Sequence, residues 1–271
     1  MYKGQITASV IFAAGKGSRM KGFEGNKTLL PLVAAESPYK GSNPILLNVL
    51  NSLPPGPKAV VVNHGKEELM KFTRSYDLIY CEQPVINGTG GALMASMEFI
   101  QNSEYERLLI TMGDVPLVKP SSYEKLLNSL AEFHMTVLGF RPQDKKEYGV
   151  LETVNDEVMR IIEWKYWKEF SEDKQGTLYI CNSGIYAARK EELVHYLHIL
   201  KKRPHTVIKE RNGKMVEVKE YFITDLVQLM HEDGLKIGYL VVEDEDEVMG
   251  VDDLGSLIKA QEIFKKRLKN G

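Results

Sequence analysis

The sequence predicts an α/β fold in which a mainly parallel sheet lies between two layers of helices. Two observations lead to this prediction. Short apolar runs of strand length alternate with segments of helical periodicity through the first half of the chain, and a helix is the usual crossover between parallel strands. The composition is that of an ordinary globular chain, with 271 residues, 43% hydrophobic and 27% charged, enough for one large domain or two small ones.

The first half supplies strands and helices in alternation. Ligands of such sheets bind at the carboxyl ends of the parallel strands, so the loops that follow the strands are the first place to look for a site. In order, we expect a strand at 6–13, a loop rich in glycine and lysine up to 29, a helix at 46–53 that two prolines end, a strand at 58–63, a helix at 67–74, a strand at 78–80, a helix at 88–100 and a strand at 108–112.

The second half contains more strands than helices. We expect strands at 135–140, 149–153, 158–162, 178–187 and 236–242, and helices at 191–200, 222–231 and 254–268. This pattern favours a smaller mixed or antiparallel sheet here. The acidic run 243–247 is expected to be a solvated turn, because like charges so close together repel one another. We expect one domain, 1–271, with a first half at about 1–133 and a second at about 134–271.

Charge and cysteine content narrow the function classes. The formal net charge is −2, which argues against general binding to nucleic acid or a membrane surface. We see no run that predicts a signal peptide or a membrane span. Cys81 and Cys181 are the only cysteines, so a reduced compartment, the cytoplasm by default, is expected. The sequence does not indicate an oligomeric state.

The loop after the first strand predicts a binding site for a polyphosphate. Glycines placed directly after a buried strand let the backbone turn sharply and present N–H groups to phosphate oxygens. Three cations accompany them, and the Walker and dinucleotide patterns do not fit. The alternative is a flexible surface loop with incidental lysines. The residues of this loop that carry the prediction are Ala13, Ala14, Gly15, Lys16, Gly17, Ser18, Arg19 and Lys27.

Carboxylates near strand and helix ends predict a magnesium site. Asp114 follows Gly113 at the end of an apolar strand, where a lone oxygen ligand for Mg²⁺ beside phosphates is a common use. Asp252 and Asp253 stand at the start of the last helix. Helix capping is the alternative in both places, and it fits one of the two adjacent aspartates.

Two further groups of polar residues are candidates for binding. Gln83 precedes Gly88 and Thr89, where a helix N-terminus offers free N–H groups to an anion or a base edge. A glycine-rich helix start without a ligand is the alternative. In the second half, polar residues at 163–165, 182–184 and 220–225 interrupt apolar strands, and together they are typical of a sugar pocket.

The order of these motifs resembles that of the sugar-phosphate nucleotidyltransferase superfamily, and in particular the N-terminal uridyltransferase domain of the bacterial bifunctional N-acetylglucosamine-1-phosphate uridyltransferases. The resemblance runs through nearly the whole chain. It implies a Rossmann-like three-layer sandwich of the GT-A type with a smaller sugar-binding sheet. The motifs that carry it lie at 12–20 with Lys27, 82–83 with 88–90, 113–117, 148–149, 163 with 165, 182–184, 220–225 and 250–253.

The resemblance also implies residue roles. Phe12, the loop from Ala13 to Gly15, and the turn at Gly88 and Thr89 would hold the nucleotide, and Arg19 and Lys27 would contact its phosphates as catalytic residues. Asp114 would bind Mg²⁺ together with Asp252. The residues implied for the sugar 1-phosphate are Gly149, Glu163, Asn182 and Thr224, with Lys165 near its phosphate.

Several positions depart from the pattern of this superfamily. The uracil-reading glutamine falls at Tyr80, and the segment 84–87 is longer than usual, so the base is left open. Met112 and Phe222 each stand where a tyrosine is common, and Asp252 stands where the second metal ligand is usually asparagine. The chain also stops soon after the transferase helix, so we expect no acetyltransferase half.

The expected reaction joins a nucleoside triphosphate, UTP by resemblance, to a sugar 1-phosphate such as N-acetylglucosamine 1-phosphate, with release of pyrophosphate. A cytidylyl- or guanylyltransferase acting on another phosphate monoester is the alternative within the same fold. A non-catalytic sensor of nucleotide sugars is the alternative from another class. The charged side chains Arg19, Lys27, Asp114 and Asp252 argue against the sensor.

Overall fold

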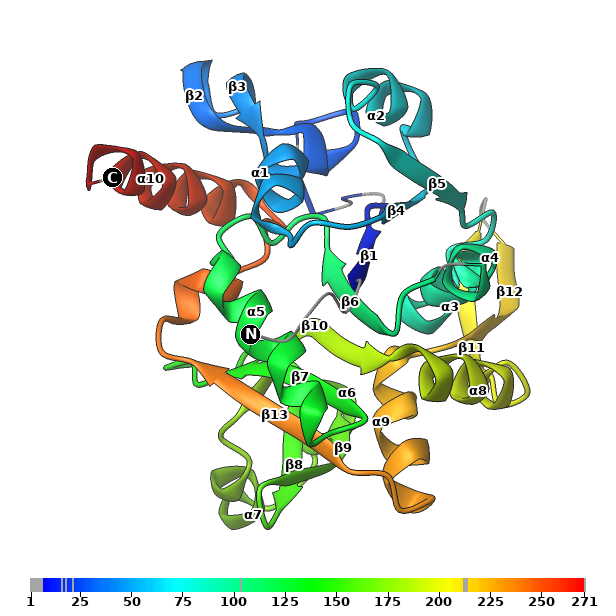
Figure 1. Ribbon diagram of the computed structural model, residues 1–271. Coiled ribbons are helices and arrows are strands. Elements are labelled where there is room, and N and C mark those ends of the chain that lie inside the picture. Colours follow the sequence, from blue (N-terminus) through cyan, green and yellow to red (C-terminus); the bar gives the residue numbers. More distant parts are fainter. Residues whose placement is uncertain are drawn as a thin grey trace.

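The computed structural model describes residues 7–15, 17, 19–20, 22–102, 104–211 and 214–270 (Figure 1). Among these residues, a nine-stranded sheet forms the centre, with the path β13-β7-β10-β6-β1-β4-β5. All neighbours on this path run parallel except β10, which is antiparallel to both β6 and β7. The strands are β1 (Thr7–Phe12), β4 (Lys58–Val62), β5 (Leu78–Glu82), β6 (Arg107–Met112), β7 (Met135–Phe140), β10 (Cys181–Arg189) and β13 (Ile237–Val242).

The smaller sheet predicted for the second half is an antiparallel pair, β8 (Val150–Val154) with β9 (Glu157–Ile162). It is not a separate sheet, because Val150 pairs with Cys181 at the start of β10 and so joins the pair to the central sheet. The other strands of the second half, β7, β10 and β13, lie in the central sheet itself. Both halves of the chain therefore build one continuous sheet.

Helices cover both faces of this sheet, as the alternating sequence predicts. Val10 of β1 packs into the core on one face and its neighbour Ile11 into the core on the other, because successive side chains of a strand point in opposite directions. The first face is covered by α3 (Thr89–Ala95), α4 (Met97–Gln101), α8 (Lys190–Leu200) and α9 (Ile223–Glu232). The second is covered by α1 (Ile45–Ser52), α2 (Lys66–Phe72) and α5 (Pro120–Asn128).

Some predicted boundaries are wrong. The helix expected at 88–100 is two helices, α3 and α4, because the Ser96 hydroxyl donates to the Leu93 carbonyl and ends the first. The strand expected from residue 178 begins at Cys181, after the short helix α7 (Glu172–Thr177). The elements that were not predicted are α5, α6 (Trp164–Trp167), α7 and the hairpins β2–β3 (Pro31–Ser37, Lys40–Pro44) and β11–β12 (His205–Arg211, Lys214–Glu220).

The last helix, α10 (Leu254–Asn270), lies beside the β2–β3 hairpin at one end of the molecule (Figure 1). Leu32 of β2 and Phe264 of α10 share a third apolar cluster. Immediately before α10, the Val251 N–H donates to the Asp114 carbonyl at 2.9 Å. This bond holds the residue after it, Asp252, beside the end of β6. None of the helices in the described ranges combines the length and apolar character needed to span a bilayer.

The prediction for the acidic run is wrong at Glu247. Residues Glu245–Val248 form a short 3-10 helix, and Glu247 is 2% exposed. Its carboxylate accepts from the Lys119 N–H at 3.1 Å and from the Ser122 hydroxyl, and it pairs with the Lys119 ammonium. These donors lie at the start of α5, where N–H groups lack partners within the helix and a negative charge is favourable. The carboxylate is buried because it caps a helix.

We predict that Glu247→Ala lowers the free energy of unfolding by about 1–3 kcal/mol, because two partly buried donors lose their acceptor. The matched control is Glu243→Ala, which removes an exposed carboxylate from the same acidic run. Urea denaturation measures both variants by the shift in midpoint at constant slope. Equal midpoints for the two variants would contradict the capping role.

Candidate active site

The phosphate loop and the acidic residues meet at one edge of the sheet. Phe12 at the end of β1 is in register with Val61 of β4 and Met112 of β6. Since these strands are parallel, the segments that follow them leave the sheet together. The loop after β1 and the turn at Gly113 and Asp114 therefore lie side by side, as the sequence predicts.

A cavity of about 340 Å³ opens at this edge. Most of the residues predicted to bind the nucleotide and the metal line it, together with four residues that were not predicted. Lys16 and Ser18 of the predicted loop lie outside the described residues. The lining residues are Phe12, Ala13, Ala14, Gly15, Gly17, Arg19, Lys27, Gln83, Gly88, Thr89, Asp114 and Asp252, together with Thr28, Ile86, Ala92 and Met112.

Lys27 lies between the two predicted metal ligands. Its Nζ is 2.5 Å from Asp114 Oδ2 and 2.7 Å from Asp252 Oδ1. The Arg19 guanidinium reaches the other oxygen of Asp252, with 3.1 Å between the nitrogen and Oδ2. Two cations and two carboxylates thus form one chain of ion pairs, assembled from segments far apart in the sequence.

The Lys27 ammonium is held tightly. Its side chain is 11% exposed, and its stem packs over Gly17, where a Cβ would come within 3.3 Å of the Lys27 Cβ. Burial by itself would lower the pKa of Lys27, but the charges and hydrogen bonds of Asp114 and Asp252 outweigh it, so the pKa is raised. Lys27 is therefore a permanent cation at neutral pH.

The donor set at this point suits Mg²⁺. Two carboxylates converge on one cation, and magnesium sites beside phosphates commonly use one or two carboxylates with phosphate oxygens and water. Within the described ranges, no three His, Cys, Asp or Glu side chains are grouped to hold a metal ion. A magnesium ion here would rest on Asp114, Asp252 and the phosphates of a substrate. Asp253 is already engaged, since it accepts from the N–H of Ser256 at 2.8 Å as a helix cap.

The turn before α3 is fixed by backbone and side-chain bonds. Gln83 Nε2 donates to Asn87 Oδ1 at 2.9 Å and to the Gly88 carbonyl at 3.2 Å. Gly88 has φ +92°, and a Cβ there would stand 2.3 Å from the Tyr221 carbonyl oxygen, so only glycine fits. The Thr89 hydroxyl accepts from the Ile223 N–H at 3.1 Å at the start of α9. The predicted nucleotide turn is thereby joined to the predicted sugar side.

Four of the residues predicted for the sugar form one cluster. The Thr224 hydroxyl donates to Glu163 Oε1 at 3.1 Å, and the Asn182 N–H donates to the Gly149 carbonyl at 2.8 Å. Gly149 lies against Glu163, since a Cβ on Gly149 would be 3.6 Å from Glu163 Oε2. The Thr224–Glu163 pair and the Asn182–Gly149 pair are therefore adjacent. Burial raises the pKa of Glu163.

Lys165 lies at the margin of this cluster. Its Nζ stacks over the rings of Tyr166 and Phe222, 4.7 and 5.8 Å from their centroids. Phe222 immediately precedes α9, which carries Thr224. Lys165 is therefore near the predicted sugar side, but it does not line the cavity of about 340 Å³.

Tyr80 does not contribute to this cavity. Its hydroxyl shares a hydrogen bond of 2.7 Å with the hydroxyl of Thr73 at the end of α2. It packs in the core on the opposite face from Cys81, its neighbour in β5. Tyr80, at the position where the resemblance implies a uracil-reading glutamine, thus has a hydrogen-bond partner elsewhere in the fold.

A second cavity adjoins the first. It has a volume of about 840 Å³ and shares Arg19 and Asp252 with the cavity beside the phosphate loop. Lys146, Tyr148 and Lys259 are among its other lining residues. The Arg19–Asp252 ion pair therefore lies where the two cavities meet.

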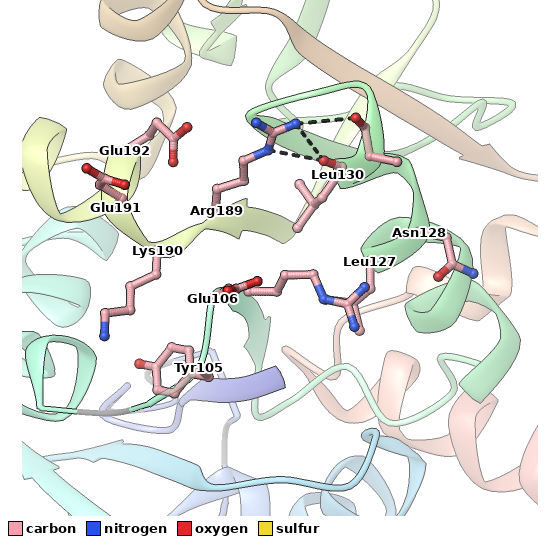
Figure 2. Close-up of a pocket in the computed structure, with 11 residues that line it drawn as sticks. Tyr105, Glu106, Leu127, Asn128, Leu130, Arg189, Lys190, Glu191 and Glu192 are labelled. Atoms are coloured by element: carbon pink, nitrogen blue, oxygen red, sulfur yellow. Dashed lines mark hydrogen bonds between the residues drawn. The ribbon is translucent and has the colours of Figure 1, made fainter. Parts of the chain in front are cut away.

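A cavity of about 600 Å³ lies at the opposite edge of the sheet, where β6 begins and β10 ends (Figure 2). The Arg189 guanidinium there donates to the carbonyls of Leu130 and Ala131, and Lys190 Nζ stacks over Tyr105, 5.3 Å from its ring centroid. These cations serve the fold. Three carboxylates also line this cavity, which disfavours a polyphosphate; they belong to Glu106, Glu191 and Glu192.

Comparisons with known proteins agree with this geometry. Residues 9–212 match the family described as the MobA-like NTP transferase domain. The chain belongs to this family. Membership confirms the predicted place among the nucleotidyltransferases, and the MobA-like NTP transferase match includes most of β1, the phosphate loop, β6 and Asp114.

Proteins named bifunctional protein GlmU are similar over almost the whole chain. The one from Cereibacter sphaeroides is 30% identical over 268 residues, which is 96% of this chain and 52% of the relative. The one from Sulfurimonas denitrificans is 32% identical over 277 residues, which is 100% of this chain and 56% of the relative. This MobA-like NTP transferase therefore spans about half the length of these relatives.

Solved structures confirm the predicted fold class. A uridine diphosphate N-acetylglucosamine pyrophosphorylase from Trypanosoma brucei superposes with a TM-score of 0.71 at 13% identity, covering 94% of this chain and 65% of that one. A putative glucose-1-phosphate thymidylyltransferase from Bacillus anthracis gives a TM-score of 0.64 at 19% identity, covering 95% and 94%. At these identities the likeness establishes the architecture alone.

Proposed function

We propose that this chain transfers a nucleotidyl group from a nucleoside triphosphate, most favourably UTP, to a sugar 1-phosphate, most favourably N-acetylglucosamine 1-phosphate. The observation that carries the proposal is the position of the Lys27 ammonium. It lies within 2.7 Å of both Asp114 and Asp252, beside a glycine-rich loop at the carboxyl edge of a parallel sheet. The similarity to the GlmU proteins supports the choice of base and sugar.

The proposed reaction is an in-line displacement. An oxygen of the sugar 1-phosphate attacks the α-phosphorus, the bond from this phosphorus to the bridging oxygen breaks, and pyrophosphate leaves. The nucleophile is already an anion at neutral pH, so the protein needs no general base. Its task is to align two anions and to neutralise charge.

The side chains have distinct roles in this proposal. The backbone from Ala13 to Gly15 faces the phosphates, Lys27 neutralises them, and Arg19 stabilises the charge that develops toward pyrophosphate. Mg²⁺, when held by Asp114 and Asp252, supplies further charge neutralisation on the phosphate oxygens.

The acceptor side of the proposed reaction is the second half of the chain. The cluster of Gly149, Glu163, Asn182 and Thr224 binds the sugar, and Lys165 lies near its phosphate. The two halves, about 1–133 and 134–271, thus act as one domain. Both cysteines are free thiols, Cys181 in a buried position, which accords with the cytoplasmic location we propose.

The alternative within the same fold uses another base or acceptor. It has one specific observation in its favour, since Tyr80 bonds to Thr73 and does not line the cavity. The acceptor would then be another phosphate monoester, and CTP or GTP the donor. A non-catalytic sensor would bind the nucleotide sugar without releasing pyrophosphate.

Pyrophosphate release measured across four triphosphates and three acceptors tests the proposal. We expect the highest kcat/KM with UTP and N-acetylglucosamine 1-phosphate, and lower values with glucose 1-phosphate and mannose 1-phosphate. Release that is highest with CTP or GTP would select the same-fold alternative. Tight binding of a nucleotide sugar with no release from any pair would select the sensor.

A further inference from the structure

We infer that Asn26 is a positioning residue of this site, whose buried carboxamide holds Lys27 between Asp114 and Asp252. The kinetic part of this inference rests on the proposed function, and the structural part does not. Asn26 is 0% exposed and stands directly before Lys27. It does not line the cavity of about 340 Å³, so it acts through its neighbours and has no direct contact with a ligand.

The carboxamide of Asn26 uses its full hydrogen-bonding capacity. Nδ2 donates to the Ala13 carbonyl at 3.1 Å and to the His64 carbonyl at 3.0 Å. Oδ1 accepts from the Thr28 N–H at 3.0 Å and from the Thr28 hydroxyl at 2.7 Å. An amide side chain has two N–H donors and one oxygen with two lone pairs, so all four positions are filled. The two carbonyl acceptors also fix which atom is nitrogen.

These four bonds join three segments of the chain at the active edge. Ala13 follows β1 and begins the phosphate loop, and His64 lies in the connection from β4 to α2. Thr28 belongs to the single 3-10 turn Lys27–Leu29, whose N-cap is Asn26. One buried amide therefore connects the ends of two parallel strands to the turn that carries the lysine.

Lys27 is anchored from both sides as a result. Asn26 before it and Thr28 after it are bonded to each other and are buried, at 0% and 2% exposure. The lysine backbone between them has little freedom, and its stem packs over Gly17. The anchored lysine holds its Nζ within hydrogen-bond distance of two carboxylates. A lysine with a mobile stem would lose rotamer entropy on reaching the same position, and this loss would weaken both ion pairs.

Neither an aspartate nor an apolar side chain fits this arrangement. An aspartate at the same position would turn acceptor oxygens toward the carbonyls of Ala13 and His64. An apolar residue would leave the buried carbonyls and the Thr28 N–H without partners, at the desolvation cost of each group. The amide supplies two N–H donors and one acceptor oxygen, a combination that neither of these side chains has.

The test uses Thr28→Val and Asn26→Asp, with Thr73→Val as the matched control. Thr28→Val keeps the shape and removes the hydroxyl bond to Oδ1. Thr28 also lines the cavity of about 340 Å³, so the readout on the protein without ligands is the one that isolates the position of Lys27. Thr73 is an equally buried threonine with two hydroxyl partners, Leu69 and Tyr80, away from the cavity. The structural readout is the rate at which Lys27 is acylated by an amine-reactive ester, followed by peptide mass spectrometry on the full chain without ligands.

We expect Lys27 to react several-fold faster in Thr28→Val than in the wild type and at the wild-type rate in Thr73→Val. A displaced ammonium loses its carboxylate partners and becomes accessible. In steady-state assays we expect kcat to fall ~10- to 100-fold in Thr28→Val, with the KM values little changed, since small misplacements of a catalytic group cost this much. In a Lys27→Met background, adding Thr28→Val should have no further effect on kcat.

The outcomes separate the possibilities. Unchanged Lys27 reactivity and kcat in Thr28→Val, with a loss of stability like that of Thr73→Val, would show that Asn26 is structural only and overturn the inference. If Asn26→Asp does not fold, Thr28→Val alone decides. If the wild type releases no pyrophosphate but Lys27 is acylated faster in Thr28→Val, the proposed function fails and the positioning role of Asn26 is supported.

Discussion

Replacement of Asp114 by alanine is expected to lower kcat ~10²–10³-fold, the usual loss when one preorganised electrostatic group is removed from a transition state. Asp114 is one of the two carboxylates that converge on Lys27, and it stands at the end of β6. Without it, the proposed metal retains one protein ligand, and the Lys27 ammonium loses its nearer partner. Pyrophosphate release at saturating substrates measures kcat, and a Mg²⁺ titration should require more metal for half-maximal rate.

Asp253→Ala is the matched control for Asp114→Ala. Asp253 is adjacent to Asp252, but its carboxylate accepts from the N–H and the hydroxyl of Ser256 at the start of α10. We expect a modest loss of stability, typical of a lost cap, and kcat close to that of the wild type. If Asp253→Ala were as slow as Asp114→Ala, the assignment of Asp252 as the second ligand would be wrong.

Replacement of Arg19 by alanine is the second change with a large expected effect. The Arg19 side chain is 69% exposed and forms an ion pair with Asp252. An exposed ion pair adds little to stability, so the melting temperature should stay near the wild-type value. We expect kcat to fall ~10²–10³-fold, because the positive charge that the proposed mechanism places opposite the leaving pyrophosphate is lost.

Arg19→Lys serves as the comparison for this variant. It keeps the charge but replaces a planar fork by a single ammonium, so its kcat should lie between those of Arg19→Ala and the wild type. A folded Arg19→Ala protein with kcat near the wild-type value would remove Arg19 from the proposed mechanism. A rise in KM alone would restrict Arg19 to binding the ground state.

The central architecture could be predicted because its signals are local. Apolar runs separated by helical segments indicate parallel strands, and a loop with glycine and lysine directly after one of them indicates the active edge. The position of Asp114 beside the phosphate loop could be predicted, because a carboxylate at a strand end has few packing reasons to be there; its role as a metal ligand stays a prediction. The contact between Lys27 and Asp252 joins residues 225 positions apart. It could be expected only from the resemblance, which includes both motifs, and not from composition.

The features that were missed depend on distant partners. Glu247 lies in a run of acidic residues, a pattern that predicts a solvated turn. Its burial depends on donors at Lys119 and Ser122, which are 128 and 125 residues away in the sequence. Asn26 shows only a weak signal, a polar residue before an apolar run, and its importance arises from carbonyls at Ala13 and His64. A single sequence does not contain these pairings, because nothing local specifies them.

The antiparallel direction of β10 determines where residues of the proposed acceptor site can be placed in this chain. Because β10 runs against β6, its first residues, not its last, reach the active edge, and a Cβ on Gly184 would lie 3.4 Å from the Met112 side chain at the end of β6. Its last residue, Arg189, lies at the far edge beside Leu130. Libraries intended to change the proposed acceptor should therefore randomise the beginning of this strand and leave its end, where Arg189 donates to Leu130, unchanged.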